Sequence, residues 1–254
     1  MRLVASLALF GALALSSPPA RAYTLHTTDE GKPVRWAATS VEVTIDEASL
    51  RALGDDAALA VSAAFAAWLE VEGAATPEVT VVIGPVDEVG YRAGAPNRST
   101  IRFVAGGHAP AGLALATTVV SFDPSGTILD ADIIINGLPG RRFAVLEGAP
   151  SDHDHDTYGA FDLQDVLTHE AGHFFGLAHN DADAAATMFP DIAPGETSKR
   201  SLGDDDEAGL RALYLPVDPP IAACAFTPRP STQIAPALLL AAALALVRRA
   251  RARR

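Results

Sequence analysis

Cysteine is nearly absent from this chain: among its 254 residues only Cys224 carries a thiol. One cysteine cannot form an internal disulfide, so stability has to come from the apolar core and from any metal that the chain binds. The length is enough for one domain with a sizeable core and short appendages. No internal repeat is evident.

Basic residues are also scarce in the body of the chain. Residues 23–247 hold all 31 acidic residues but only twelve of the nineteen basic ones, which gives a net charge of −19. Nucleic acids and anionic membrane surfaces are bound by basic faces, and this composition does not provide one. We therefore expect no nucleic-acid partner, and a charge that mainly keeps the protein in solution.

An apolar run stands apart from this acidic body at each end of the chain. At the N-terminus, Arg2 precedes the run from Leu3 to Leu15, and Ala20-Arg21-Ala22 is a small-x-small cleavage site. This pattern predicts a signal peptide over residues 1–22, cleaved before Tyr23, and hence export. An uncleaved anchor is the alternative, but the run is shorter than the roughly 20 residues that span a bilayer.

The second run, from Ile234 to Val247, follows a proline-bearing linker over residues 220–233 and is followed by five arginines. Its fourteen apolar residues are marginal for a membrane span, and the arginines would stay on the cytoplasmic side. Residues 234–254 are therefore predicted to be an export-linked tail that attaches the protein to a membrane or cell surface.

Between these ends, residues 23–219 are predicted to form one α+β domain. Alternating and β-branched runs predict five strands, over residues 35–45, 79–84, 99–104, 114–123 and 127–136. An amphipathic run predicts one helix over residues 50–68, with Asp46 as its N-cap. The turn Asp123-Pro124-Ser125-Gly126 predicts that the last two strands form a hairpin. The first half should be a mixed sheet with one helix packed on it.

The second half is predicted to be mainly helical and irregular. A helix over 163–175 should begin after Asp162 and end at Gly176, because glycine is the usual residue just past a helix C-terminus. Residues 180–200 are expected to be irregular. A second helix is predicted over 202–214, with three aspartates at its N-terminal end, where negative charge suits the helix dipole.

A polar loop over residues 151–162 alternates His153 and His155 with aspartates. A cation site and a solvated acidic loop both explain this pattern, so no metal is assigned there.

The strongest chemical signal is the stretch THEAGHFFGLAHN, residues 168–180. His169 and His173 are four residues apart, so both can point at one ion from the same helix face, with Glu170 at its edge. In an unbroken helix His179 would point away from that pair. Gly176 can adopt a positive φ and turn the chain, which makes His179 geometrically possible as a third ligand.

Three neutral imidazoles leave one position of a tetrahedral Zn²⁺ open, which is the arrangement of a catalytic site. Zinc lowers the pKa of water at that position toward ~7 and polarises a carbonyl, and Glu170 would be the general base. The alternative is a surface helix that carries histidines without metal. That alternative does not explain why Gly176, His179 and, nine residues later, Met188 occur together.

These residues resemble the metzincin zinc-peptidase signature with its Met-turn. Within that clan the chain is most similar to the matrixins, which are matrix-metalloprotease-like peptidases, in their bacterial secreted branch. The segments FDLQDVLTHEAGHFFGLAHN, TMFP, LGDDDEAGLRALY, AAFAAWLEV and GTILDADIIIN carry the resemblance, which covers about residues 33–215.

The resemblance implies a metzincin/zincin-like catalytic domain with a twisted, mainly parallel five-stranded sheet, two long helices and a small irregular C-terminal subdomain that ends in a helix. It implies that His169, His173 and His179 bind one catalytic Zn²⁺ and that Met188 forms a hydrophobic floor beneath them. Substrate would lie extended above the zinc and pair with an edge strand. Residues 189–196 would help to wall the pocket for the residue after the scissile bond.

The chain departs from the family pattern in several places. Asn180 stands where matrixins typically have serine, and Leu115 and Asp132 stand at two positions of the structural zinc of vertebrate matrixins, so that zinc is not expected. Asp130 and Asp132 are open to two interpretations, as calcium ligands or as a solvated hairpin edge. No cysteine precedes the domain, so cysteine-switch latency is not expected. The tail with Cys224 is similar to tripartite C-terminal sorting tags of Gram-negative surface proteins, in which Cys224 would be the processing or anchoring point; the alternative is that Cys224 is a free thiol in a linker.

The sequence thus predicts a secreted or surface-retained, monomeric zinc endopeptidase that acts on extended protein or peptide substrates in the extracellular space or at the outer surface. One alternative is a catalytically silent, zinc-stabilised surface binding module, which the intact Glu170 argues against. Another is an exported peptidase for cell-wall or one narrow peptide substrate, which would use the same chemistry.

Overall fold

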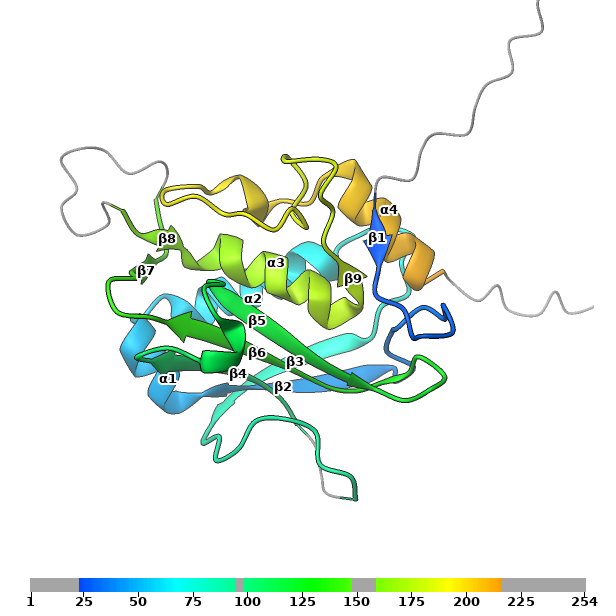
Figure 1. Cartoon of the computed structure of the whole chain (residues 1–254), viewed down its shortest axis with the longest axis horizontal. Helices are drawn as coiled ribbons and strands as arrows, with labels where there is room; N and C mark the ends of the chain where they lie inside the picture. Colours follow the sequence, from blue (N-terminus) through cyan, green and yellow to red (C-terminus); the bar gives the residue numbers. More distant parts are fainter. Residues whose placement is uncertain (1–22, 95–97, 148–158, 216–254) are drawn as a thin grey trace, which may run out of the picture. The chain divides into compact units, whose positions relative to one another are not determined.

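The computed structural model describes residues 23–94, 98–147 and 159–215 (Figure 1). The predicted signal peptide, the linker with Cys224, the C-terminal tail and the loop positions His153 and His155 lie outside the described residues. The predictions made for those segments therefore stay predictions.

A five-stranded sheet forms the centre of the described domain (Figure 1). Its strands, in the order in which they pair, are β3 (Glu78–Gly84), β2 (Ser40–Asp46), β4 (Ser99–Ala105), β6 (Ile128–Gly137) and β5 (Ala116–Phe122). The first four are parallel, and β5 pairs antiparallel with β6 at one edge. The predicted α+β class and mainly parallel five-stranded sheet are confirmed.

The hairpin between β5 and β6 forms at the predicted turn. Asp123 Oδ1 accepts hydrogen bonds from the backbone N–H groups of Ser125 and Thr127, at 2.8 and 3.0 Å, and the Gly126 N–H donates to the Asp123 carbonyl. An aspartate that bonds the backbone two residues later closes a turn in this way. The hairpin places β5 at the edge of the sheet, where no other described strand pairs with its outer side.

Two long helices, α2 (Ala57–Leu69) and α3 (Leu163–Phe175), pack on each other and on one face of the sheet, as Figure 1 shows. The remaining elements are short: β1 (Thr24–Leu25), α1 (Glu47–Leu53), η1 (Ala109–Ala111), β7 (Phe143–Ala144), β8 (Phe161–Asp162), β9 (Leu177–Ala178), η2 (Ser198–Arg200) and α4 (Asp204–Leu213). After α3 the described chain is irregular except for β9, η2 and α4. This matches the predicted small C-terminal subdomain.

Two predicted elements have different bounds in the structure. The single helix expected over 50–68 is two helices, because the chain turns at Gly54, where φ is 102°; α1 and α2 are bent by 104° relative to each other. The strand expected over 35–45 begins only at Ser40. Before it, Arg35 makes only an isolated parallel bridge with Thr127, and the Trp36 N–H donates to the Tyr214 hydroxyl. Asp46 is the N-cap of α1, as predicted, and accepts from the Ser49 N–H.

Three buried aromatic side chains donate hydrogen bonds to backbone carbonyls of α3. Trp68 Nε1 donates to the Thr168 carbonyl at 2.8 Å, and Trp36 Nε1 donates to the Phe174 carbonyl at 2.9 Å. The Tyr214 hydroxyl donates to the carbonyl of the next residue, Phe175, at 2.8 Å. Rings of this size anchor a helix through their buried area, and the hydrogen bond fixes its position along its axis.

The face of β6 away from the helices is polar, and it is buried. Asp132 is 1% exposed and accepts from Gly90 N, Thr100 N and Thr100 Oγ1. Asp130 is 2% exposed, and its Oδ1 has no hydrogen-bond partner among the described residues; burial, and then the charge of Asp132, raise its pKa to about 7. The interpretation of these two residues as a solvated hairpin edge is therefore wrong. Asp132 holds the β3–β4 connection onto the sheet by hydrogen bonds.

Within the described ranges, no single helix is long and apolar enough to cross a membrane. Only α1 and α2 taken together reach the required length and composition, and a sharp bend separates them.

Candidate metal centre and active site

Helix α3 begins and ends at the residues that the sequence predicts. Asp162 Oδ1 accepts from the Asp165 N–H at 2.8 Å and caps the first turn. Gly176 ends the helix in the left-handed region, with φ at 102°. A Cβ at Gly176 would overlap the Val34 carbonyl oxygen, so only glycine fits both the conformation and the space. The turn carries the chain into β9 and on to His179.

The three predicted histidine ligands converge in the structure. Their candidate ligand nitrogens all lie within 4.8 Å of one another, and His169 Nε2 is 3.2 Å from His179 Nε2. Two nitrogens at corners of a zinc tetrahedron with Zn–N of about 2.0–2.1 Å would be about 3.3 Å apart. Among the described residues this is the one group of three or more His, Cys, Asp or Glu side chains close enough to share a metal.

Backbone carbonyls orient two of these imidazoles. His169 Nδ1 lies 2.7 Å from the Thr187 carbonyl and His173 Nδ1 lies 2.8 Å from the Leu177 carbonyl. A carbonyl oxygen only accepts, so each Nδ1 carries the proton, and each Nε2 keeps its lone pair for a ligand. Such contacts fix the tautomer and ring orientation of metal-binding histidines.

Burial keeps these imidazoles neutral. It lowers the pKa of His169 well below its usual range, and it also lowers the pKa values of His173 and His179. A metal ligand must be deprotonated, so burial prepares the residues for a cation. Three neutral imidazoles fit zinc as a donor set.

Glu170 lies in the same cleft and is 5% exposed. Burial raises the pKa of its carboxyl group to about 7, although a hydrogen bond from Thr118 opposes this shift. That bond runs from Thr118 Oγ1 to Glu170 Oε2, at 2.6 Å. A carboxylate whose pKa lies near neutrality is suited to accept and release a proton. Thr118 on β5 was not identified from the sequence, since its contact with Glu170 is made across 52 residues.

Met188 packs against α3, and Asp206 fixes the backbone of the turn that contains Met188. The Met188 side chain is 1% exposed, and its sulfur lies against Gly172 of α3. Asp206 on α4 accepts from the backbone N–H groups of Thr187 and Met188, at 2.8 and 3.1 Å. Because the Thr187 carbonyl orients His169, Asp206 supports that imidazole through the turn. In the sequence Asp206 was interpreted only as a charge at a helix N-terminus.

Asn180, the departure from the family pattern, is fully engaged. Its Nδ2 donates to Asp205 Oδ2 at 2.7 Å, and its Oδ1 accepts from the Ala182 N–H at 3.0 Å. Its own N–H donates to the Met188 carbonyl at 2.9 Å. The residue after His179 therefore ties the Met188 turn to α4.

The centre opens into a cleft of about 600 Å³. Residues from the β5 side, from α3 and from the segment after Met188 line it: Leu115, Ala116, Thr117, Thr118, Val166, His169, Glu170, His173, Pro190, Asp191 and Ile192. His26, Phe161 and Arg141, which were not identified from the sequence, lie at the same cleft. The cleft is bounded by an edge strand on one side and by an irregular wall on the other.

The α+β fold, with a histidine-bearing helix packed on the sheet and Met188 against that helix, is consistent with a metzincin catalytic domain. Comparison with known families gives a narrower match: residues 117–215 match the family model described as Matrixin. This range begins on β5 and ends after α4, so it includes the histidine cluster, Glu170 and Met188.

Curated relatives agree with this match. The chain is 38% identical over 91 residues to Metalloendoproteinase 1 of Glycine max, covering 31% of this chain and 29% of that protein. It is 37% identical over 86 residues to Neutrophil collagenase of Homo sapiens, covering 31% of this chain and 18% of that protein. A match to Metalloendoproteinase 5-MMP of Arabidopsis thaliana, 29% identical, covers 75% of this chain.

The chain spans about half the length of that last relative, at 49%, and less than a third of the other two. The chain is therefore similar to matrixins over the segment that holds the histidine cluster, and to proteins named as metalloendoproteinases.

Proposed function

We propose that this protein is a zinc-dependent endopeptidase that hydrolyses peptide bonds in extended protein or peptide substrates. The observation that carries the proposal is the convergence of three imidazoles, whose pKa values are all lowered, beside the buried Glu170 in one open cleft. Other arrangements of three histidines occur in proteins, but a carboxyl group with a pKa near neutrality beside them suits hydrolysis.

His169, His173 and His179 would hold the zinc. When bound, zinc lowers the pKa of a coordinated water to about 7 and polarises a carbonyl oxygen. Glu170 takes the proton of the attacking water and passes it to the leaving amine. Thr118 holds the Glu170 carboxylate at the β5 side of the cleft, and Met188 and Gly176 keep the three imidazoles on one centre.

The cleft suits an extended chain. β5 offers a free strand edge, to which a peptide can add as a further strand by backbone hydrogen bonds. On the opposite side, Pro190, Asp191 and Ile192 form a wall. We propose that this wall contacts the side chain that follows the scissile bond, and that the enzyme acts as a monomer.

We also propose export. Residues 1–22 would be removed as a signal peptide, and residues 23–219 would form the peptidase domain. The linker over 220–233 and the tail over 234–254 would sort or anchor the protein at the outer surface, with Cys224 as the processing or attachment point. The runs of small and apolar residues followed by arginines support this division. A secreted bacterial matrixin with such a tail would act outside the cell.

The test of the peptidase function compares the parent protein with Glu170→Ala. Zinc content is measured by mass spectrometry, and cleavage is measured on casein and on a random peptide library, with and without chelator. Both proteins should hold about one zinc, while kcat/KM falls about 10²–10⁴-fold in the variant because the general base is lost. An alanine variant as active as its parent would refute the mechanism, and a zinc-loaded parent that cleaves no library peptide would favour the binding-module alternative.

A further inference from the structure

One wall of the cleft is held by a buried lysine. Lys199 on η2 is 1% exposed, and its Nζ donates to the carbonyl of Phe189 at 2.8 Å and to that of Asp191 at 2.6 Å. The ammonium group also lies over the Phe189 ring, 5.2 Å from its centroid. Lysine is almost never fully buried unless it is paired, so this position calls for a structural reason.

The two carbonyls belong to the residues on either side of Pro190. The Lys199 ammonium group fixes the orientation of both peptide groups by hydrogen bonds. The ring of Pro190 fixes the φ angle of that residue. The backbone of residues 189–191 therefore has little torsional freedom left. Pro190 and Asp191 line the cleft, so this restriction acts on the wall that substrate would touch.

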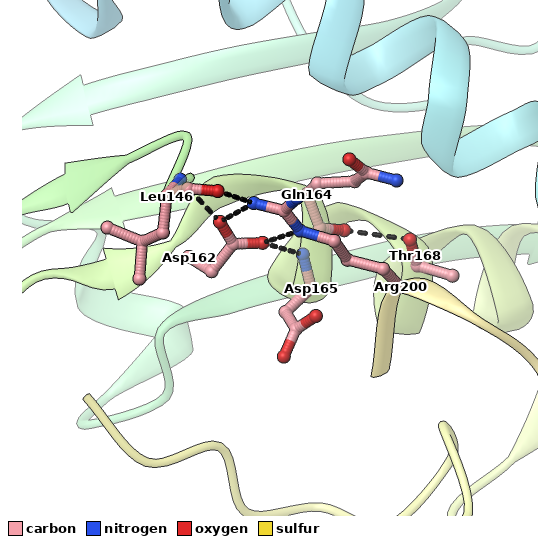
Figure 2. Close-up of polar contacts among 6 residues, drawn as sticks. All are labelled: Leu146, Asp162, Gln164, Asp165, Thr168 and Arg200. Atoms are coloured by element: carbon pink, nitrogen blue, oxygen red, sulfur yellow. Dashed lines mark hydrogen bonds and ion pairs between the residues drawn. The ribbon is translucent and has the colours of Figure 1, made fainter. Parts of the chain in front are cut away.

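The residue that follows Lys199 connects η2 to α3, the helix that carries the candidate ligands His169 and His173. The next residue, Arg200, donates through Nε to Asp162 Oδ1 at 2.9 Å and through Nη2 to the Leu146 carbonyl at 2.6 Å, as Figure 2 shows. Asp162 is the N-cap of α3. The cleft wall is thus connected through Lys199, Arg200 and Asp162 to the start of that helix.

A buried carboxyl group lies nearby. Asp165 is fully buried one turn before His169, and among the described residues no donor meets hydrogen-bond geometry with either of its carboxylate oxygens. The backbone N–H of Lys199 nevertheless lies close enough to lower the pKa of Asp165. Figure 2 shows this carboxylate pointing away from the Arg200–Asp162 pair. Its charge, together with those of Glu196 and Asp191, acts on the Lys199 ammonium. The cation is therefore compensated by two carbonyls, one ring and nearby carboxylates, although an apolar side chain there would need no compensation.

We propose that Lys199 is a positioning residue that fixes the cleft wall, residues 189–192, relative to α3 and thereby sets which side chain is accepted after the scissile bond. The specificity part of this proposal rests on the proposed peptidase function. The wall-fixing part concerns the folded protein alone, and it is measured separately.

The experiment uses the zinc-loaded full chain with Lys199→Met, which keeps the side-chain length and removes the charge and the donors. Lys32→Met is the matched control, because Lys32 is the chain's other lysine and is exposed, paired with Glu30. Hydrogen exchange is followed in peptides that cover residues 189–196. Cleavage is followed on two peptides that differ only in having leucine or alanine after the scissile bond.

In Lys199→Met we expect exchange in the 189–196 peptides to be about tenfold faster, because the wall opens locally. The ratio of kcat/KM between the two peptides should move about threefold toward one, mainly through KM, because a mobile wall discriminates less between side chains. Zinc content should equal that of the parent, and Lys32→Met should match the parent in both measurements.

A folded, zinc-loaded Lys199→Met protein with parental exchange and a parental peptide ratio overturns the proposal. If that variant does not fold, Lys199→Gln decides in the same way, because its amide is shorter and keeps at most part of the two bonds. If the parent cleaves neither these peptides nor any peptide of the library, the peptidase function fails, and the exchange measurement alone decides whether Lys199 holds the wall.

Discussion

At the scale of single residues, the missing side chain at Gly172 is a tight packing constraint within α3, the helix that carries His169 and His173. A Cβ there would overlap the Met188 sulfur and lie 2.8 Å from Trp68 Cζ2. Gly172 stands between the candidate ligands His169 and His173, so Met188 can approach the helix directly beneath them. The sequence motif leaves this position undefined, and only the packing explains why it is glycine.

Gly172→Ala should therefore lower the free energy of unfolding by about 1–3 kcal/mol, the usual cost of overpacking a buried site. This loss would outweigh the better helix propensity of alanine. Urea unfolding of the zinc-loaded protein measures it. Gly84→Ala is the control, because its Cβ would lie 3.6 Å from Thr44 Cγ2, an ordinary contact. Equal stability of the two variants would show that the Met188 contact is not tight.

The candidate site was predictable from the sequence where its residues are close in the chain. His169, Glu170 and His173 share one helical turn, and Gly176 signals the turn toward His179. Residues that support these groups from a distance were not predictable. Thr118, Asp206 and Lys199 act through contacts that depend on how β5, α4 and η2 pack, and no local pattern distinguishes them from surface polar residues.

At the scale of elements, the start and the end of α3 are determined by residues at its two termini. Asp162 and Gly176 are local signals, so the bounds of α3 were predicted to the residue. The region of α1 and α2 was harder, because its apolar spacing continues across Gly54, and only the turn at that glycine separates the two helices. Periodicity reports which face is buried, and it does not report where the axis changes direction.

The first turn of α3 also carries a destabilising group. Burial, and then the charge of Asp162, raise the pKa of Asp165 to about 6. Between about pH 4 and pH 6 the folded chain keeps a proton at Asp165 that the unfolded chain has released, so the free energy of unfolding falls as pH rises through this window.

Asp165→Asn should remove this loss. We expect the variant to be more stable than the parent at about pH 8, by up to about 3 kcal/mol, and the gain to disappear near pH 4. Urea unfolding at the two pH values measures the difference. Asp55→Asn, at an exposed position, should match the parent at both. A gain that is the same at both pH values would show that its cause is packing rather than the charge.

At the scale of the whole molecule, the metal would join the helical layer to the irregular C-terminal subdomain. His169 and His173 lie on α3, whereas His179 follows β9 in the chain that leads to Met188 and α4. With one cysteine, no internal disulfide makes this connection. Zinc binding should therefore contribute to the stability of the entire domain.

Chelation should lower the melting temperature by roughly 10 °C, since a ligand at 1,000 times its Kd contributes about 4 kcal/mol and each kcal/mol shifts a domain of this size by about 2–4 °C. Added zinc should restore it. His173→Ala should show no zinc-dependent shift. If chelation still destabilises His173→Ala and calcium reverses this, a second cation stabilises the domain independently of the histidine group.

The hydroxyl group of Thr118 connects the strand proposed to bind substrate with the carboxyl group proposed to transfer the proton. Thr118 Oγ1 lies 2.6 Å from the Glu170 carboxylate and 3.0 Å from the Glu170 carbonyl, and its single hydrogen cannot be donated to both at full strength. Thr118 belongs to β5, the strand that would pair with substrate. If a peptide pairs with β5 and shifts Thr118, it would change the hydrogen bond at the proposed general base, Glu170. Protonation of Glu170 would then change peptide affinity, and peptide binding would change proton affinity, by the same factor.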